Sequence, residues 1–264
     1  MIKNLSNILH KDIYFLYNNL HRDSIIDEDF SYYICRMIQE NKDFEDALVL
    51  LHSKGGNLKS GGKIADFFHR MYNNVSYYVP ERCGSTATLM LLSGDVIYLD
   101  DASIVTPCEP QMDTVSGMKV SVNDIRNYIQ DYGEDGLDVI DLCKYHSTVR
   151  YFRDLCHKLY GENTFDKIIH FMLNDINSHD YFISVEELAL MGIAIGHLED
   201  LPVEELHFIH EFIKDIQRME KRHIGSVILG SHTGYIFRKD IGDDNRKIKE
   251  EYEKVESNKV LIKR

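Results

Sequence analysis

The stretch ALVLLHSKGG, residues 47–56, gives the clearest indication of the architecture of this chain. Its first part, 47–51, is a short and fully apolar run, which is typical of a strand buried on both faces in a parallel sheet. The run leads into two adjacent glycines, Gly55 and Gly56, which allow positive φ angles and let backbone N–H groups approach a ligand. Taken alone, such a pair is more often an ordinary turn between a strand and a helix.

The segments on either side of this stretch alternate between strand and helix patterns. Upstream, a segment rich in strand-forming residues lies at 11–20, and a helix pattern lies at 27–40. Downstream, helices are expected at 60–72 and 85–93, and strands at 75–79, 96–99 and 103–105. Alternation of this kind builds a parallel sheet with right-handed crossovers, so we expect an α/β fold.

The chain becomes mainly helical after Pro110. Residues 122–173 have helical patterns that are interrupted by glycines. Ser184 followed by Glu187 is the pattern of a capping box, which predicts a further helix start. A short final strand at 193–195 is expected after that helix, and another helix is expected from Pro202.

The last segment, 238–264, is dominated by charge. It holds 9 basic and 7 acidic residues with few apolar ones, which predicts either a solvated helix or a mobile tail. We therefore expect one domain over 1–237, with its core at about 10–120 and a helical region at about 121–237. The charged C-terminal tail follows this domain.

Composition excludes some classes of protein. The chain has 43 acidic and 30 basic residues and a net charge of -13, which argues against a dedicated nucleic-acid binder. No window of about 20 apolar residues occurs, so we expect no membrane span. The five cysteines have neither the CxxC spacing nor the zinc-finger pattern, which fits reduced thiols and a cytoplasmic protein.

Two further motifs follow strands and could carry chemistry. Ser85, in CGSTA, lies between a strand and a helix, where it could be a helix cap or a nucleophile. The loop TPCEPQ, 106–111, has two prolines that make it rigid. Together with the glycine pair, these motifs lie at the carboxyl ends of parallel strands, where open α/β sheets bind ligands.

In this order, the motifs resemble those of the Clp-protease and crotonase-fold serine peptidases. The closest similarity is to the signal-peptide-peptidase-like branch called serine dehydrogenase proteinase, and it covers roughly residues 10–205. The resemblance implies a Clp/crotonase-like α/β spiral of ββα repeats with a helical C-terminal portion. The motifs that carry it are HSKGG (52–56), VP (79–80), GSTATL (84–89), DVIYL (95–99), TPCEPQ (106–111) and SHDYFISVEE (178–187).

Several positions depart from the family pattern. Lys54 replaces a proline of the glycine motif, Thr86 and Ala87 replace Gly or Ala-Gly after the nucleophile, and Glu109 replaces an aspartate. The membrane-spanning segment of many relatives is missing. These departures leave a catalytically inactive homologue open as an alternative.

The resemblance also implies roles for individual residues. Ser85 would be the nucleophile, and the backbone N–H groups of Gly56 and Thr86 would form the oxyanion hole. His179 would be the general base, with Asp180 beside it, although adjacent side chains rarely point the same way. The alternative bases, for a Ser–Lys dyad, are Lys54 and Lys63.

Other reactive residues have simpler interpretations. A thiol nucleophile at Cys83 is less favoured, because a free cysteine is usually a small buried apolar residue. His52, at the end of a strand, is expected to be structural. His207 and His210 have helical spacing but no third ligand in register, so we expect no metal site, and we expect no cofactor.

The sequence thus predicts a serine peptidase that hydrolyses peptides or unfolded protein segments. The alternative is an inactive homologue that serves as an assembly or binding subunit, and an acyl-CoA-type crotonase enzyme is less favoured. Proteins of this fold usually assemble through helices after the core, so we expect a homo-oligomer that uses 122–173. Without the tail, which carries +2, the rest of the chain carries -15, which would favour neutral or basic peptides.

Overall fold

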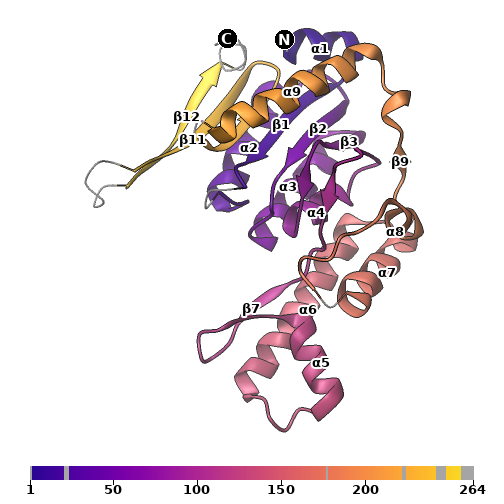
Figure 1. The fold of residues 1–264 in the computed structure, drawn as a ribbon, viewed down its shortest axis with the longest axis vertical. Helices are drawn as coiled ribbons and strands as arrows, with labels where there is room; N and C mark the ends of the chain where they lie inside the picture. The colour runs from indigo at the N-terminus through magenta and orange to yellow at the C-terminus, as the bar shows by residue number, and fades with distance from the viewer. Residues whose placement is uncertain (1, 21–23, 177, 222–223, 242–247, 257–264) are drawn as a thin grey trace.

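A computed structural model describes residues 2–20, 24–176, 178–221, 224–241 and 248–256. Its centre is an eight-stranded sheet with the order β12-β11-β10-β1-β2-β3-β5-β9 (Figure 1). Five of these strands are parallel: β1 (Asp12–Asn18), β2 (Asp46–His52), β3 (Asn74–Val79), β5 (Val96–Leu99) and β9 (Ile195–Gly196). The other three continue the sheet in antiparallel pairing: β10 (Ile224–Leu229), β11 (Thr233–Ile241) and β12 (Ile248–Glu256).

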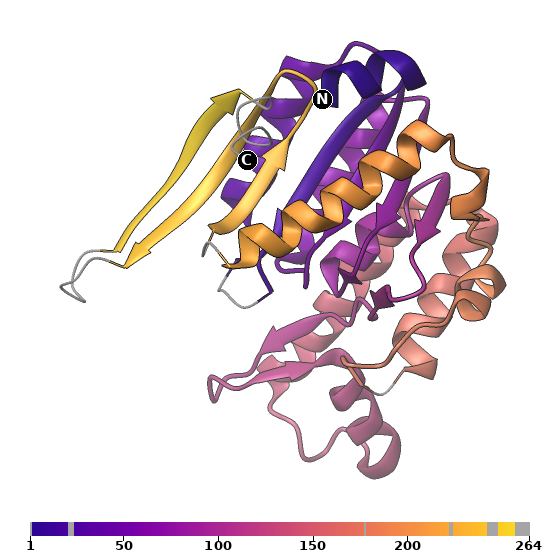
Figure 2. The ribbon, with the colours of Figure 1, turned by 45° about the horizontal axis from the view of Figure 1, so that its top comes forward.

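Helices cover both faces of this sheet. The N-terminal half supplies α1 (Ile2–Leu9), α2 (Glu28–Asn41), α3 (Leu58–Met71) and α4 (Thr86–Leu91). The C-terminal half supplies α9 (Val203–Lys221), which lies across the face opposite α2 and α3 (Figure 2).

Burial on both faces explains the unbroken apolar run that follows Asp46. In β2, Val49 and Leu51 pack into the core beneath α2, α3 and α4, whereas Leu48 and Leu50 pack into the core beneath α9. Because successive side chains of a strand point to opposite faces, a strand covered on both sides is apolar at nearly every position. In the same way, Phe15 of β1 meets Phe212 of α9 with ring centroids 3.8 Å apart.

Short strands turn away from the main sheet after β2, β3 and β5. The residue after β2, Ser53, forms a parallel bridge with Cys83 of β4 (Arg82–Cys83). β4 in turn pairs in parallel with β6 (Ile104–Val105). Each unit is therefore a main strand followed by a short strand or bridge, and α3 or α4 closes the first two units. The Clp/crotonase-like α/β fold expected from the sequence is confirmed.

A smaller lobe of hairpin and helices follows β6. It begins with the antiparallel hairpin of β7 (Gln111–Asp113) and β8 (Lys119–Ser121). Its helices are α5 (Val122–Tyr132), α6 (Val139–Leu159), α7 (Glu162–His170) with the π-helical turn Phe171–Asp175, and α8 (Val185–Leu190). The hairpin, α5 and α6 lie at one end of the molecule, away from α1 (Figure 1). A short 3-10 turn, Leu198–Asp200, then leads into α9.

The expectation for the C-terminal segment is wrong in its described part. Neither a helix nor a mobile tail occurs at 238–241 and 248–256, because these residues lie in β11 and β12, paired from Thr233↔Glu256 to Ile241↔Ile248. The expected domain boundary at 237 falls within β11. A charged sequence fits this position because edge strands commonly carry charge, which discourages pairing with other chains.

Two smaller expectations also need correction. The segment at 193–195 contributes to β9, but this is not the last strand, since β10, β11 and β12 follow it. The strand at 103–105 is confirmed as β6, yet it belongs to the small sheet with β4 and not to the main sheet. None of the helices in the described ranges combines the length and the apolar character that a membrane crossing requires.

Candidate active site

The glycine turn after β2 packs directly against the segment that carries Ser85. Gly55 has φ +98°, and a Cβ atom there would lie 2.5 Å from the Gly84 carbonyl oxygen and 2.7 Å from Ser85 Cβ. Only glycine fits this close approach. The Ser53 hydroxyl supports the turn from behind, since it accepts from the Gly55 N–H at 3.0 Å and donates to Asn18 Oδ1 at 2.6 Å.

Ser85 occupies the N-cap position of α4 but does not act as a cap. Its side chain makes no capping hydrogen bond, and its backbone has φ 51° and ψ -126°. Such a conformation in a non-glycine residue costs about 1–3 kcal/mol and is concentrated at functional sites. A serine on a strained turn between a strand and a helix is also the geometry that exposes a nucleophilic hydroxyl.

A cavity of about 770 Å³ opens in front of Ser85. It lies at the carboxyl ends of β2 and β3 and is bordered by the β7–β8 hairpin and by α6. Five of the seven residues expected at the site line it: Ser85, Gly56, Thr86, His179 and Lys54. The structure therefore gathers residues that are up to 125 positions apart in the sequence.

The two expected oxyanion donors both have their N–H groups unoccupied. In the part of the chain that the structure describes, neither the Gly56 N–H nor the Thr86 N–H donates to a protein acceptor. Since buried backbone donors are normally paired, two open donors beside one serine are notable. Both N–H groups can donate to one ligand oxygen placed between them.

His179 faces a buried carboxylate, and this carboxylate is not Asp180. The Nδ1 atom of His179 lies 3.7 Å from Glu109 Oε2, and the Glu109 side chain is 5% exposed. Nδ1 is itself buried, while the His179 side chain as a whole is 40% exposed. Asp180 is exposed and does not line the cavity; its backbone N–H bonds to the Ser178 hydroxyl.

Glu109 is ionised at neutral pH in spite of its burial. Burial raises the pKa of this carboxyl, but His179, Ser121 and Asn123 outweigh the effect and hold the pKa below its ordinary value. Polar and positively charged groups beside a carboxyl favour its charged form. Glu109 can therefore orient His179 and stabilise it when it is protonated.

The loop that carries His179 is fixed on its C-terminal side. The Ile183 N–H donates to the carbonyl of Val105 in β6 at 2.9 Å. The expected capping box at α8 is confirmed, with the Ser184 hydroxyl accepting from the Glu187 N–H and the Glu187 carboxylate accepting from the Ser184 N–H. Glu109 follows β6 directly along the chain, so one strand positions both the histidine and its partner.

The remaining candidates lie in different places. Lys54 lines the cavity, whereas Lys63 is exposed on α3 and does not line it. Burial raises the pKa of the Cys83 thiol far above its ordinary value and that of Cys108 to about 12, so neither is a thiolate at neutral pH. His52 is buried and stacks on Tyr17 with ring centroids 5.2 Å apart.

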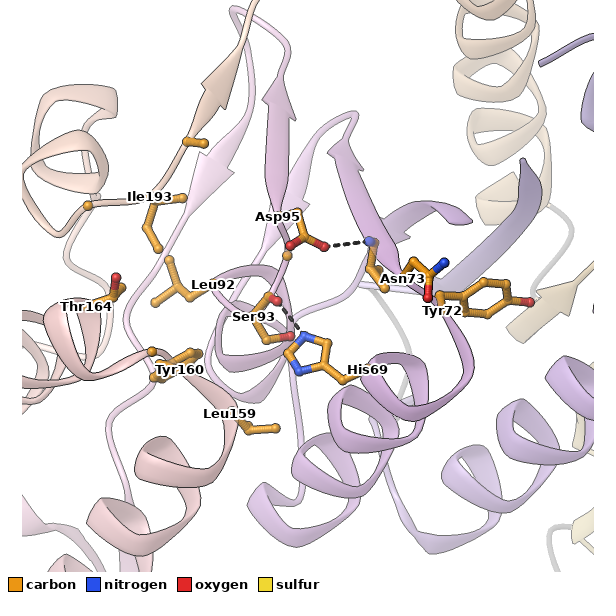
Figure 3. Close-up of a pocket in the computed structure, with 15 residues that line it drawn as sticks. His69, Tyr72, Asn73, Leu92, Ser93, Asp95, Leu159, Tyr160, Thr164 and Ile193 are labelled. Atoms are coloured by element: carbon orange, nitrogen blue, oxygen red, sulfur yellow. Dashed lines mark hydrogen bonds between the residues drawn. The ribbon is translucent and has the colours of Figure 1, made fainter. Parts of the chain in front are cut away.

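A second cavity, of about 320 Å³, lies at the opposite ends of the strands, before β3 and β5. His69 Nε2 lies 2.6 Å from the Ser93 carbonyl oxygen there, and Asp95 accepts from the Val75 N–H at 2.7 Å (Figure 3). Both side chains are thus engaged with backbone groups. The residues that line this cavity do not pair a nucleophile with a base.

Sequence reasoning missed the partnership of Glu109 with His179. The available signal was that Glu109 stands where the family pattern has an aspartate, which keeps a carboxylate at that position. The Thr86 hydroxyl was also missed, because only its backbone N–H was expected to matter.

The chain is similar to several known proteins. A curated relative, an uncharacterized protein of Methanocaldococcus jannaschii, is 24% identical over 169 residues, which are 63% of this chain and 58% of the relative. This chain therefore spans less than two thirds of that protein. Among solved structures, a membrane-bound stomatin-specific protease mutant in complex with a substrate peptide is 17% identical with a TM-score of 0.42, over 67% of this chain and 72% of the other. ClpP1 from Listeria monocytogenes is 12% identical with a TM-score of 0.44, over 70% and 91% of the two chains.

The family itself is decided by a family model, that of the ClpP-like SDH-type serine proteinases, which matches residues 8–226. This match includes β1 to α9 and every residue discussed around the cavity. The chain belongs to the family of ClpP-like SDH-type serine proteinases.

Proposed function

We propose that the protein is a serine peptidase in which Ser85, His179 and Glu109 act as nucleophile, base and orienting acid. One observation carries the proposal: His179 turns its buried Nδ1 toward the ionised Glu109, in the same cavity as the strained Ser85. In a triad, the acid binds the Nδ1 side of the imidazole and leaves Nε2 to take the serine proton.

The reaction follows from these positions. Ser85 Oγ attacks the carbonyl carbon of the scissile peptide bond, and its proton passes to His179 Nε2. The N–H groups of Gly56 and Thr86 bind the negative oxygen of the tetrahedral intermediate. His179 then gives the proton to the leaving amine, which yields an acyl-enzyme on Ser85. A water molecule, deprotonated by His179, hydrolyses this ester and restores the serine.

The Ser85 hydroxyl and the His179 ring must come closer together for the proton transfer between them. Within the described residues, no hydrogen bond joins the Ser85 hydroxyl to a base. Catalytic hydrogen bonds are often long in free enzymes and tighten when the substrate binds. The exposed part of the His179 ring faces the cavity that a peptide would fill.

Labelling with a fluorophosphonate probe tests the proposal. Wild-type protein should be labelled, and mass spectrometry of the digest should place the label on Ser85. Ser85→Ala should abolish labelling, and His179→Ala should slow it strongly, whereas Lys54→Met should be labelled like wild type. Equal labelling of Ser85→Ala, or a folded wild type that is never labelled, would overturn the proposal and favour the inactive binding subunit. Loss of labelling in Lys54→Met alone would assign the base to Lys54.

Peptides or unfolded protein segments are the substrates that we propose. The cavity is open and large enough for several side chains, and its lining is mixed, with apolar Leu58, Met112 and Tyr151 beside polar groups. The homo-oligomer and the cytoplasmic location expected from the sequence remain predictions.

A further inference from the structure

The side chain of Thr86 occupies a place where the family pattern has no side chain beyond a small residue. Its hydroxyl donates to the Gly56 carbonyl oxygen at 2.9 Å. Thr86 is 1% exposed, and Gly56 is partly buried. Thr86 thereby connects the start of α4 to the glycine turn that follows β2.

This hydrogen bond completes the support of both peptide groups that flank Gly56. The peptide before Gly56 is held by the Ile26 N–H, which donates to the Gly55 carbonyl at 2.9 Å. The peptide after Gly56 is held by Thr86 at its carbonyl and by Ile26 at its N–H, since the Asn57 N–H donates to the Ile26 carbonyl at 2.7 Å. With both planes fixed, the direction of the Gly56 N–H is fixed as well.

The fold also makes room for the threonine. Gly61, in the first turns of α3, lies against the Thr86 methyl group, and a Cβ atom on Gly61 would clash with Thr86 Cγ2. Thr86 and Gly61 therefore fit each other. The pair brings the beginning of α3 against the beginning of α4, directly behind the cavity.

We propose that the Thr86 hydroxyl is a positioning group for the oxyanion hole: by holding the Gly56 carbonyl, it fixes the peptide after Gly56 and, together with the Ile26 hydrogen bond to the Gly55 carbonyl, keeps the Gly56 N–H aimed at the developing negative charge. This inference rests on the proposed function. A donor aimed at the transition state lowers the barrier to acylation, whereas substrate binding in the ground state depends on it little. The loss of this hydroxyl should therefore lower kcat and leave KM nearly unchanged.

The experiment measures the rate at which a fluorophosphonate labels Ser85. In that reaction the Ser85 Oγ–P bond forms, the P–F bond breaks, fluoride leaves and the serine proton passes to the base. Thr86→Val, which keeps the shape, should slow labelling about tenfold or more, since a complete oxyanion donor contributes about 10²–10³. Thr86→Ser, which keeps the hydroxyl, should stay within about threefold of wild type. Equal rates for the valine variant and wild type would overturn the inference, and so would equal losses in both variants.

A second pair of variants guards against a folding defect in Thr86→Val. Gly61→Ala should push the Thr86 side chain away and slow labelling, whereas the same change combined with Thr86→Ala should add little to the effect of Thr86→Ala alone. Two residues in contact are expected to show such coupling in a double-mutant cycle. Equal slowing by Gly61→Ala in both backgrounds contradicts the inference. A wild type that is not labelled at all contradicts the proposed function instead, so the two failures are distinguishable.

Steady-state kinetics separate a positioning role of Thr86 from a loss of stability or of substrate binding. Once a cleavable peptide is available, Thr86→Val should lower kcat with little change in KM, and its thermal unfolding midpoint should stay near that of Thr86→Ser. A rise in KM at unchanged kcat would mean that Thr86 acts on substrate binding and would overturn the inference.

Discussion

The Glu109 side chain is ionised although it is buried, and burial of a charge is costly unless neighbours stabilise it. His179 lies at ion-pair distance from it, and the polar groups of His179, Ser121 and Asn123 lower the pKa of the carboxyl. A proline on each side, Pro107 and Pro110, restricts the loop that carries it. The fold thus maintains a carboxylate behind the histidine.

Replacement of this carboxylate by an amide should reduce activity strongly. Glu109→Gln keeps the size of the side chain but removes the charge that orients and stabilises a protonated His179. By comparison with amide replacement of the acid in a Ser–His–Asp triad, labelling of Ser85 should slow by up to about 10⁴-fold. The measurement is the second-order rate of fluorophosphonate labelling, with circular dichroism as the check on folding.

Asp180→Asn is the matched control for this prediction. It makes the same chemical change beside the same histidine, but on an exposed side chain outside the cavity. It should leave the labelling rate within about twofold, because exposed charges are screened by solvent. If Asp180→Asn were the more damaging of the two, Glu109 would not be the orienting acid.

His52 gives the protein a predictable sensitivity to acid. Burial, and next to it the positive charge of Arg82, lower the pKa of His52 from 6.5 to about 4. The carboxylate of Glu81 lies 4.0 Å away but is half exposed, so it compensates little. Since the unfolded chain takes up the proton near pH 6.5 and the folded one only near pH 4, acid favours unfolding across this window.

The free energy of unfolding should therefore fall as the pH drops from about 6.5 to about 4, by on the order of 3 kcal/mol from His52. Above pH 6.5 this group contributes no pH dependence. Urea unfolding at several pH values, in wild type and in His52→Gln, measures the difference. The variant should have a flatter dependence in that window; an identical slope in both proteins would contradict the prediction.

At the scale of elements, the strands that could be predicted are those whose burial leaves a local pattern. β2 and β3 are apolar on both faces because helices cover both sides, and the patterns at 47–51 and 75–79 reveal this. β10 could not be predicted in its place, since it pairs with β1 more than 200 positions away, as Phe15↔Leu229 illustrates. Pairing between distant segments has no periodicity that one segment could display.

The residues of the candidate site also fall into those that a local motif predicts and those that depend on contacts between distant segments. Ser85, Gly56 and Thr86 follow strands or begin a helix, and His179 lies in the loop before α8, so motifs near element ends indicate them. The contact between Glu109 and His179 depends on how two loops approach each other after folding. Side-chain direction in loops is set by tertiary packing, which a single sequence does not display.

The β11–β12 hairpin provides an element-scale prediction. Tyr235 of β11 packs on Tyr33 of α2 with ring centroids 4.7 Å apart, and Lys254 of β12 pairs with Glu40 at 2.7 Å. A truncation after Phe237 would remove β12 and leave β11 as a shortened, unpaired edge. We expect a lower thermal unfolding midpoint and a stronger tendency to aggregate.

Differential scanning fluorimetry and light scattering of the truncated chain measure this effect. Lys254→Ala is the control, because the loss of one exposed ion pair should cost at most about 1 kcal/mol. An unchanged unfolding midpoint after truncation would mean that residues 238–264 behave as an independent tail.

For the whole molecule, the net charge and the charges around the cavity predict opposite peptide preferences. The chain carries -13, yet Lys54, Lys59 and Lys119 line the cavity, against Asp113 and the paired Glu109. Charges beyond about 10 Å are largely screened at 0.1 M salt, so the cavity lysines should affect a bound peptide more than the distant acidic surface does.

Acidic peptides should therefore have a lower KM than matched basic ones, and Lys119→Glu should reduce this difference in KM. A preference for basic peptides in both proteins would contradict this.

Exposed apolar side chains gather on the lobe formed by the β7–β8 hairpin, α5 and α6. Tyr132 of α5 is 74% exposed, Val139 of α6 is 71% exposed, and Met118 in the hairpin is 61% exposed. These elements lie together at one end of the molecule (Figure 1). Apolar groups concentrated on one surface commonly mark a contact with another protein. Tyr132 and Val139 lie within 122–173, and Met118 lies just before it. We expect the chains of a homo-oligomer to contact each other through this region.

Size-exclusion chromatography with light scattering should give a mass that is a multiple of 30.8 kDa. Val139→Asp should shift the mass toward one chain, because a charge in a buried apolar contact costs several kcal/mol. Val203→Asp is the matched control: Val203 is 77% exposed but lies on α9, across the sheet from this lobe, so the same change there should leave the mass unaltered. A wild type that elutes only at the mass of one chain, or equal dissociation by both variants, would show that this lobe is not the contact.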